Sequence, residues 1–203
     1  MDYRPDRLAE RLRALSPEPV KARDGLRRAA VAMALRAGAD GPELLLMRRV
    51  EREDDPWSGQ VSLPGGHVEP SDADLVATAV RETREEVGVD LGQAARALGL
   101  LEALRATAGG ETLSMAIQPC VFGMQMEVRP ELGPEAAAAF WLPLARAARG
   151  EYDGEVRREY RSVWRRLPAW EFEGHTVWGM TYRMVNELMD QMRAEEGGAS
   201  PLG

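Results

Sequence analysis

Three glutamates, Glu82, Glu85 and Glu86, lie within five residues of one another. On a helix they would fall within about one turn, where like charges repel, so some cation must offset them. Arg81 can pair with Glu85 four residues further on, but that pair leaves two carboxylates uncompensated. Hard oxygen ligands at this density suit Mg²⁺ or Mn²⁺. The cluster is therefore either a solvated helix face with salt bridges or a site for a divalent cation.

The glutamates sit in a segment with a helical period that begins near Ser71 and ends at Val87. Ser71 or Asp72 can cap its N-terminus, and Gly88 is placed to end it. The segment follows "QVSLPGG", which reads as a short strand leading into a turn. In this turn Gly65–Gly66 lets the backbone approach a ligand or a metal closely.

A helical wheel separates the acidic face of this segment from its apolar stripe. With Val76 at zero, the other members of the stripe lie within about 40° of it. The predicted stripe consists of Val76, Val80, Thr83 and Val87. The glutamates at 85, 82 and 86 fall at about 180°, 240° and 280°. The acidic face therefore leans toward the protein body instead of pointing directly away from it.

The stretch from Gly66 to Val89 resembles the signature of the Nudix family, G-x5-E-x7-R-E-U-x-E-E-x-G-U, in which U is aliphatic. The matching positions are Gly66, Arg81, Glu82, Glu85, Glu86, Gly88 and Val89. Three features depart from it: Asp72 stands for the first glutamate, eight residues instead of seven separate it from Arg81, and Thr83 replaces an aliphatic residue. The resemblance implies an α/β protein with the Nudix-type α/β/α sandwich and a mixed β-sheet.

Two of these departures, together with "GQVSLPGG", are similar to the coenzyme A pyrophosphatase branch of the family. Its members often carry "GQVSFPGG…D" and the extra residue. The segment "AW…GHTVWGMTYRM" also resembles the end of that branch. The upstream motif of the branch is present only in part. Arg48 or Arg49 could supply its arginine, whereas "DDPWSG" replaces its usual histidine-containing loop.

The resemblance also implies roles for individual residues. Glu82, Glu85 and Glu86 would hold Mg²⁺ or Mn²⁺, and the Gly66 carbonyl could be a further ligand. Arg81 would orient Glu85 without touching the substrate. Glu82 could be a ligand or the general base. In several Nudix enzymes a distant loop supplies the base, for which the candidates here, each otherwise an ordinary surface carboxylate, are Glu127, Glu131 and Glu135.

Four functions are compatible with these residues. The leading one is hydrolysis of the diphosphate of coenzyme A or acyl-coenzyme A to 3′,5′-ADP and (acyl-)phosphopantetheine. A second is hydrolysis of ADP-ribose, NADH or another nucleoside diphosphate derivative. A third is a nucleotide-binding Nudix regulator without hydrolysis, which usually lacks signature carboxylates that are present here. A fourth is an acidic scaffold with a salt-bridged helix, which would leave the register of the signature to chance.

Several arginine and aromatic residues outside the signature have two interpretations each. Phosphate contacts and rim salt bridges to "EREDD" are equally expected for Arg48, Arg49 and Arg52. Trp57 either lines the mouth of the substrate site or packs on the domain. Core packing is favoured over stacking on an adenine for Trp164, Trp170 and Trp178. His67 is expected to be structural or solvated, and His175, in a predicted hairpin turn, receives no role.

The whole chain has the composition of one soluble domain, with 203 residues, 44% hydrophobic and 29% charged. A net charge of −7 argues against nucleic-acid binding and requires positive charge to be gathered locally for an anionic substrate. No apolar run could span a membrane, and no secretion signal is seen, so we expect a cytoplasmic protein without a membrane partner. Cys120 is expected to be a buried structural thiol. A homodimer is expected by analogy with other Nudix enzymes.

The predicted elements form one mixed domain with appendages. Residues 1–25 are expected to be an N-terminal helical extension with a helix over 5–15, residues 26–195 the Nudix domain, and residues 196–203 a disordered tail. Within the domain, residues 27–50 have a strand–turn–strand pattern, and strands are expected in "ALGLLEAL" and "TLSMAIQPCVFGMQMEV". "AAAAFWLPL" is expected to begin as a helix, since alanine is the best helix former. A short helix in "LPLARAARG", a hairpin over 159–180 and a helix over 181–195 complete the chain.

Overall fold

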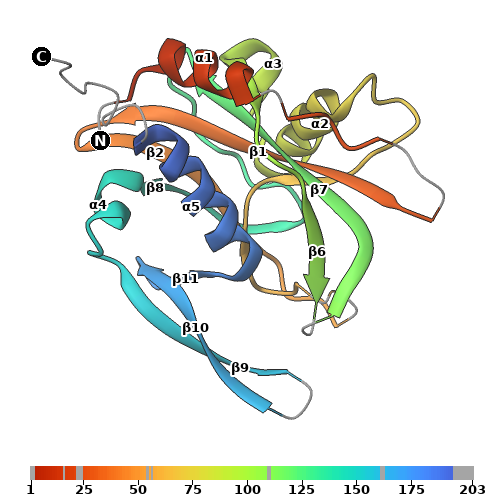
Figure 1. Cartoon of the computed structure of the whole chain (residues 1–203), viewed down its shortest axis with the longest axis vertical. Helices are drawn as coiled ribbons and strands as arrows, with labels where there is room; N and C mark the ends of the chain where they lie inside the picture. Colours follow the sequence, from red (N-terminus) through yellow and green to blue (C-terminus); the bar gives the residue numbers. More distant parts are fainter. Residues whose placement is uncertain are drawn as a thin grey trace, which may run out of the picture.

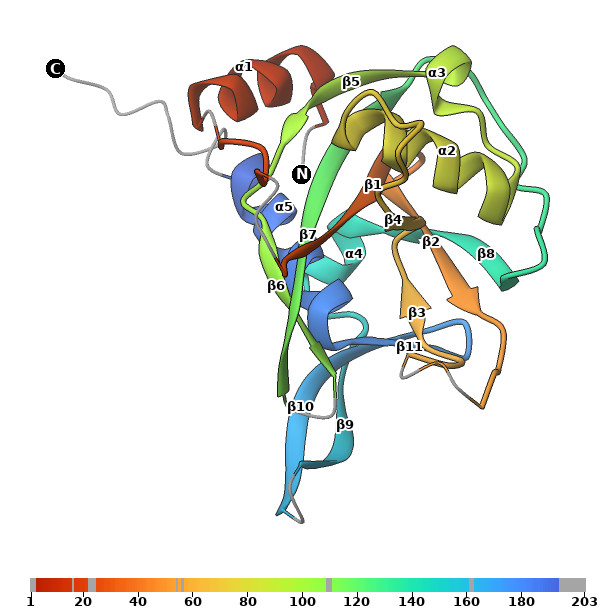
Figure 2. The same cartoon turned by 90° about the vertical axis from the view of Figure 1, so that its right-hand side faces the viewer.

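A mixed β-sheet between two layers of helices forms the protein (Figures 1 and 2). This computed structural model describes residues 3–15, 17–21, 25–53, 55, 57–108, 111–160 and 163–193. Helices α2 (Leu75–Val87) and α3 (Leu91–Ala94) pack on one face of the sheet. The helices on the other face are α1 (Pro5–Leu15), α4 (Leu144–Ala148) and α5 (Gly179–Arg193). The predicted α/β/α sandwich is therefore confirmed.

The larger sheet is organised around one parallel pair of long strands, β1 (Arg27–Gly38) and β7 (Glu111–Met124). Its main path in the described residues is β3 (Val61–Ser62), β2 (Gly41–Arg49), β1, β7 and β5 (Ala95–Leu100). Three further strands pair antiparallel with β1, β7 and β2, respectively: β4 (Gly65–His67), β6 (Leu104–Ala108) and β8 (Ala136–Pro143). The predicted strand–turn–strand over 27–50 is confirmed as β1 and β2.

Alternation along β1 explains why the sheet can be covered on both faces. Ala30, Ala32 and Ala34 are fully or almost fully buried and belong to the apolar cluster under α2. Met33 and Leu35 point the other way, into the cluster that α1 and α5 complete. Successive side chains of a strand point to opposite faces, so this one strand contributes to both cores. The small alanines allow α2 to approach the sheet closely.

The segment "AAAAFWLPL" is a strand from its first alanine, so the expectation of a helical start was wrong. Residues Ala136–Pro143 form β8, which pairs with β2 from Arg49 to Glu43. The hydrogen bonds to β2 and the burial of Ala136 and Leu142 outweigh the small intrinsic preference of alanine for helix. The short helix expected after it is confirmed as α4.

A second, smaller sheet contains β9 (Asp153–Tyr160), β10 (Val163–Phe172) and β11 (His175–Trp178). It includes the predicted hairpin, and β9 and β10 project away from the larger sheet (Figures 1 and 2). Trp170 is 2% exposed at the base of this ribbon, as expected for core packing. Trp164 is 60% exposed. Its predicted place in the core was wrong, because it lies far along the projecting part of β10, opposite Glu159.

The expectations for the two ends of the chain have different outcomes. Helix α1 has the predicted bounds and buries Leu8, Ala9 and Leu12 against the main cluster. The final helix is present as α5, whereas the tail predicted to be disordered, residues 196–203, lies outside the described residues. Cys120 is buried as expected, and burial raises the pKa of its thiol to about 12. In the described ranges, no helix is both long and apolar enough to cross a membrane.

Candidate active site

Helix α2, which carries the glutamate cluster, has well-defined ends. Asp74 caps its N-terminus by accepting a 2.8 Å hydrogen bond from the backbone N–H of Ala77. The prediction that Ser71 or Asp72 caps the helix was wrong, because the helix begins at Leu75 and Asp72 is engaged elsewhere. Gly88 ends the helix in the left-handed conformation, with φ of 67°, as predicted.

The buried face of α2 is rotated toward the glutamates compared with the predicted apolar stripe. Val76 and Val80 are only partly buried, whereas Ala79 and Thr83 are completely buried. Glu86, at about 280° on the wheel, lies close to Ala79 at about 300°, and so falls near the middle of the buried face. Thr83, the departure from the Nudix signature, satisfies its buried hydroxyl by donating to the Ala79 carbonyl at 2.6 Å.

Arg81 connects the carboxylates of α2 to the segment that precedes the helix. Its Nε and Nη2 atoms donate to the two oxygens of Asp72 at 2.9 and 3.0 Å, a bidentate pair. Its Nη1 atom donates to Glu82 at 3.0 Å and to Glu85 at 3.1 Å. Its Nη2 atom also donates to the carbonyl of His67 at 2.9 Å. The hydrogen bonds from Arg81 hold the pKa of Asp72 well below its usual range.

Glu86 is a buried carboxylate held against the glycine turn of β4. Its side chain is 3% exposed, and its Oε2 atom accepts a 2.8 Å hydrogen bond from the backbone N–H of Gly65. Arg49 lies 3.8 Å from its other oxygen. Burial raises the pKa of Glu86 to about 8, and the nearby charge of Glu82 adds to the rise, whereas Gly65 and Arg49 oppose it.

Glycine is required at both positions 65 and 66 of this turn. Gly65 has φ of 151°, and a Cβ atom there would overlap the backbone of β1 at Ala30 and Val31. A Cβ atom at Gly66 would overlap the carboxylate of Glu82. Burial raises the pKa of Glu82, although the hydrogen bond from Arg81 opposes the rise. The sequence "PGG" therefore allows strand β4 to lie directly against the acidic face of α2.

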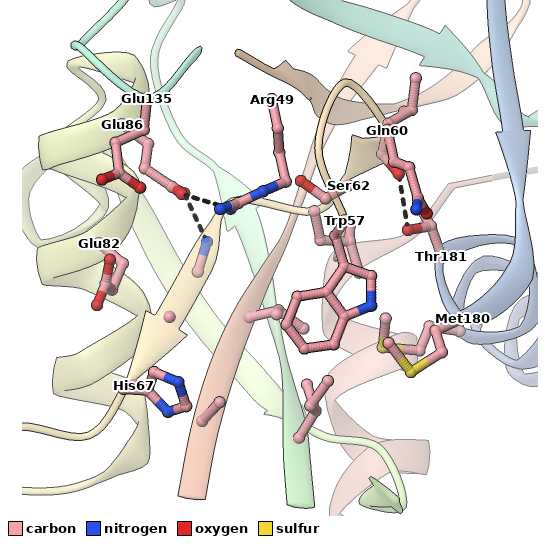
Figure 3. Close-up of a pocket in the computed structure, with 18 of the residues that line it drawn as sticks. Arg49, Trp57, Gln60, Ser62, His67, Glu82, Glu86, Glu135, Met180 and Thr181 are labelled. Atoms are coloured by element: carbon pink, nitrogen blue, oxygen red, sulfur yellow. Dashed lines mark hydrogen bonds and ion pairs between the residues drawn. The ribbon is translucent and has the colours of Figure 1, made fainter. Parts of the chain in front are cut away.

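A cavity of about 650 Å³ opens between α2, the strands and the start of α5 (Figure 3). One end is acidic, with Glu82 and Glu86 on α2 and Glu135 beside them. Trp57 and Met180 lie on the opposite side in the close-up. The apolar part of the wall is formed by Ala29, Val31, Met115, Ile117, Met180 and Met184. The cavity thus offers charge at one end and apolar surface at the other.

The predicted phosphate-binding arginines are separated by the alternation of β2. Arg49 lines the cavity and donates to Asp55 at 2.8 Å. Arg48 is outside the cavity lining. It lies near His175, whose pKa is lowered mainly by burial and further by the charge of Arg48. Arg52 pairs with Glu135 at 3.1 Å, which is the predicted type of rim salt bridge with a different partner.

The other residues singled out from the sequence differ in whether they line the cavity. Trp57 satisfies both of its interpretations, because it lines the cavity and packs partly buried against the main core. His67 is exposed at the cavity edge. Of the three loop carboxylates considered as a base, only Glu135 lines the cavity, and Glu127 and Glu131 do not. The methionines and Tyr160 of the lining could not be predicted from residue spacing, because they come from elements that are distant in the chain.

The oxygen donors at the acidic end fit a divalent cation in kind, although they are not already grouped around one point. Within the described ranges, no three histidine, cysteine, aspartate or glutamate side chains are close enough together to hold a metal ion. Arg81 takes up oxygens of Glu82 and Glu85, and Gly65 takes up one of Glu86. Burial is the main cause that raises the pKa of both Glu82 and Glu86, and the positive charges of Arg81 and Arg49 offset it only in part. A hard cation would supply further positive charge.

The fold, the acidic helix and the glycine turn together define a Nudix protein, and the comparison with known families agrees. Residues 26–163 match the NUDIX domain. The chain therefore belongs to the Nudix hydrolases, enzymes that hydrolyse diphosphate bonds and generally use divalent metal cations.

Similar proteins lie within the same family. The chain is 33% identical over 196 residues to a Nudix hydrolase NudL of Cronobacter sakazakii, covering 92% of this chain and 94% of that protein. It is 30% identical over 179 residues to a NudL of Photorhabdus laumondii, covering 88% and 92%. Both relatives are described as uncharacterized. A Caenorhabditis elegans Ap4A hydrolase has the same fold, with a TM-score of 0.52 and 20% identity over 85% of this chain and 99% of that one.

We predict that replacing Glu86 with glutamine stabilises the metal-free protein increasingly as pH rises from 5 to 8. The folded chain keeps this proton up to about pH 8, whereas an unperturbed glutamate releases it near 4.5. The wild-type protein therefore loses stability across this window, by on the order of 3 kcal/mol, and a glutamine cannot ionise. Urea unfolding with a chelator at pH 5, 6.5 and 8 measures the difference.

The matched control is Glu102→Gln, since Glu102 is exposed and lies outside the cavity lining. Its unfolding free energy should follow that of the wild type at each pH. A Glu86→Gln curve parallel to the wild-type curve would contradict the raised pKa.

Proposed function

We propose that the protein is a pyrophosphohydrolase that cleaves the diphosphate of coenzyme A or acyl-coenzyme A to 3′,5′-ADP and (acyl-)phosphopantetheine. The observation that carries this proposal is the two-ended cavity, which places Glu82 and Glu86 opposite an apolar wall of methionine, valine and isoleucine. A substrate that suits both ends has a diphosphate and a long, mostly uncharged arm. The likeness of "GQVSLPGG" to the coenzyme A branch supports the same substrate class.

The proposed cation is Mg²⁺ or Mn²⁺, held by Glu82, Glu85 and Glu86 with the Gly66 carbonyl as a further ligand. These are hard oxygen donors, and the first three lie on one face of α2 at the cavity. When bound, the cation would neutralise the diphosphate and polarise its P–O bonds. Arg81 bonds one oxygen of Glu82 and one of Glu85, so each carboxylate keeps a second oxygen with which to bind the cation.

The remaining work falls to side chains that position the groups and carry protons. Arg81, fixed by Asp72, sets the direction of the Glu85 carboxylate. Arg49 faces the acidic end of the cavity and binds phosphate oxygens. Glu135 or Glu82 takes the proton from water as it attacks one phosphorus atom in line with the bridging oxygen. The bridging P–O bond then breaks, and each product leaves as a phosphate monoester.

Two features of the chain stay predictions. These are the homodimer, expected by family analogy, and the cytoplasmic location, expected from the sequence. The limits of the Nudix domain at residues 26 and 195 and the N-terminal extension are likewise proposals. Small nucleoside diphosphate derivatives remain the partner class, because the family acts on diphosphates and the cavity is of small-molecule size.

A substrate panel with Mg²⁺ or Mn²⁺ tests the proposed activity. We expect coenzyme A or acyl-coenzyme A to have the highest kcat/KM among coenzyme A, ADP-ribose, NADH and nucleoside triphosphates, with 3′,5′-ADP identified by mass among the products. Preference for ADP-ribose or NADH would replace the substrate class while keeping the chemistry. Tight nucleotide binding with no turnover of any compound would instead show a regulator.

We further predict that Glu85→Gln and Glu86→Gln each reduce kcat by orders of magnitude while the fold survives. Removing one charged oxygen ligand weakens cation binding, although glutamine keeps the volume of the side chain. Steady-state kinetics with circular dichroism measures both effects. Glu127→Gln, an acidic position outside the cavity lining, is the control and should retain the wild-type rate. A near-full rate in both cavity variants would place the cation elsewhere.

A further inference from the structure

The projecting β9–β10 ribbon has two chemically different faces. Its strands pair in uninterrupted antiparallel register, and directly opposite residues of such a pair share a face. We call one face the cavity face, formed by Val156, Arg158, Tyr160, Val163, Arg165 and Leu167. The other, the outer face, is formed by Glu155, Arg157, Glu159, Trp164, Arg166 and Pro168. Neither the Nudix signature nor the proposed cation site explains the arginines on this ribbon.

The two faces differ in how their arginines are neutralised. On the outer face, Arg166 pairs with Glu155 at 3.4 Å, and Glu159 stands on the same face. The cavity face carries no acidic residue, yet Arg158 lies directly opposite Arg165. Among the described residues, neither of these two arginines has a carboxylate within ion-pair distance. Like charges directly opposite each other destabilise a strand pair, so an anion between them would relieve a built-in repulsion.

The cavity face adjoins the catalytic cavity at the end remote from α2. Tyr160 and Trp178 both line that cavity. The guanidinium of Arg158 lies 4.5 Å from the centre of the Trp178 ring, which places its charge at the cavity mouth. Trp178 belongs to the same face, because β11 pairs with β10 through Ala169 and Trp178. Tyr160 and Trp178 of the cavity lining therefore lie on the same face as Arg158 and as Arg165, which stands directly opposite Arg158.

We propose that Arg158 and Arg165 bind a phosphate monoester on the nucleoside part of the substrate, separate from the diphosphate that is cleaved. This proposal rests on the proposed function, in which the adenosine of coenzyme A carries a 3′-phosphate. Guanidinium groups bind phosphate oxygens in bidentate fashion, and Trp178 and Tyr160 offer surfaces for the adenine beside it. In a chain of net charge −7, this pair gathers positive charge locally for an anion. ADP-ribose and NADH lack this group.

The kinetic test compares coenzyme A with 3′-dephospho-coenzyme A. In the wild type, kcat/KM for coenzyme A should exceed that for the dephospho compound by about tenfold to hundredfold. The double variant R158Q/R165Q should lose this preference by losing rate with coenzyme A alone. R157Q/R166Q removes the same charge from the outer face and should keep the preference. Equal use of the two substrates by the wild type, or an unchanged preference in R158Q/R165Q, would overturn the proposal.

A binding measurement separates this inference from the proposed activity. Calorimetric titration with adenosine 3′,5′-bisphosphate and with AMP requires no turnover. The wild type and R157Q/R166Q should bind the bisphosphate about tenfold or more tightly than AMP, and R158Q/R165Q should bind the two alike. If the wild type cleaves neither coenzyme A compound, the proposed activity fails, and the titration still decides on the arginines. Equal wild-type affinity for the two nucleotides overturns their assignment.

Discussion

The contact between the acidic face of α2 and the glycine turn of β4 determines the rest of the site. It buries Glu86, whose charge is offset by the Gly65 N–H at 2.8 Å and by the more distant Arg49 at 3.8 Å. Burial of a carboxylate so incompletely paired is costly, which is why its proton is held up to about pH 8. The contact exists only because β1 is rich in alanine beneath α2 and because residues 65 and 66 have no side chains. A buried carboxylate of this kind is suited to the cation site proposed above.

The charges around the cavity lie in separate zones. Negative charge is concentrated on α2 and is held in place by Arg81, which itself depends on Asp72. Positive charge is placed at the edges, on Arg49 at the acidic end and on the β9–β10 ribbon at the far end. Between them lies an apolar wall from β1, β7 and α5. This order of charge, apolar surface and charge is what distinguishes the cavity from a plain acidic cleft.

Much of this could be predicted from residue spacing, and the failures have physical causes. The register of Arg81, Glu82, Glu85 and Glu86 with Gly66 led to the family, because those residues act within one local unit. The capping residue was misplaced because Asp72 had an unseen partner in Arg81. Strand β8 and exposed Trp164 were missed because pairing partners decide both. The residues at the far end of the cavity could not be predicted for the same reason, since they meet only through the tertiary fold.

The most direct test of the account is the proton balance of cation binding. Titration of the metal-free protein with Mn²⁺ at pH 7, in buffers of different ionisation enthalpy, gives the number of protons released. We predict release of about one proton per bound cation, because the cation must displace the proton of Glu86, and little release from Glu86→Gln, with weaker binding. Binding without proton release, with equal affinity in Glu86→Gln, would contradict the claim that the buried carboxylate of α2 is the cation site.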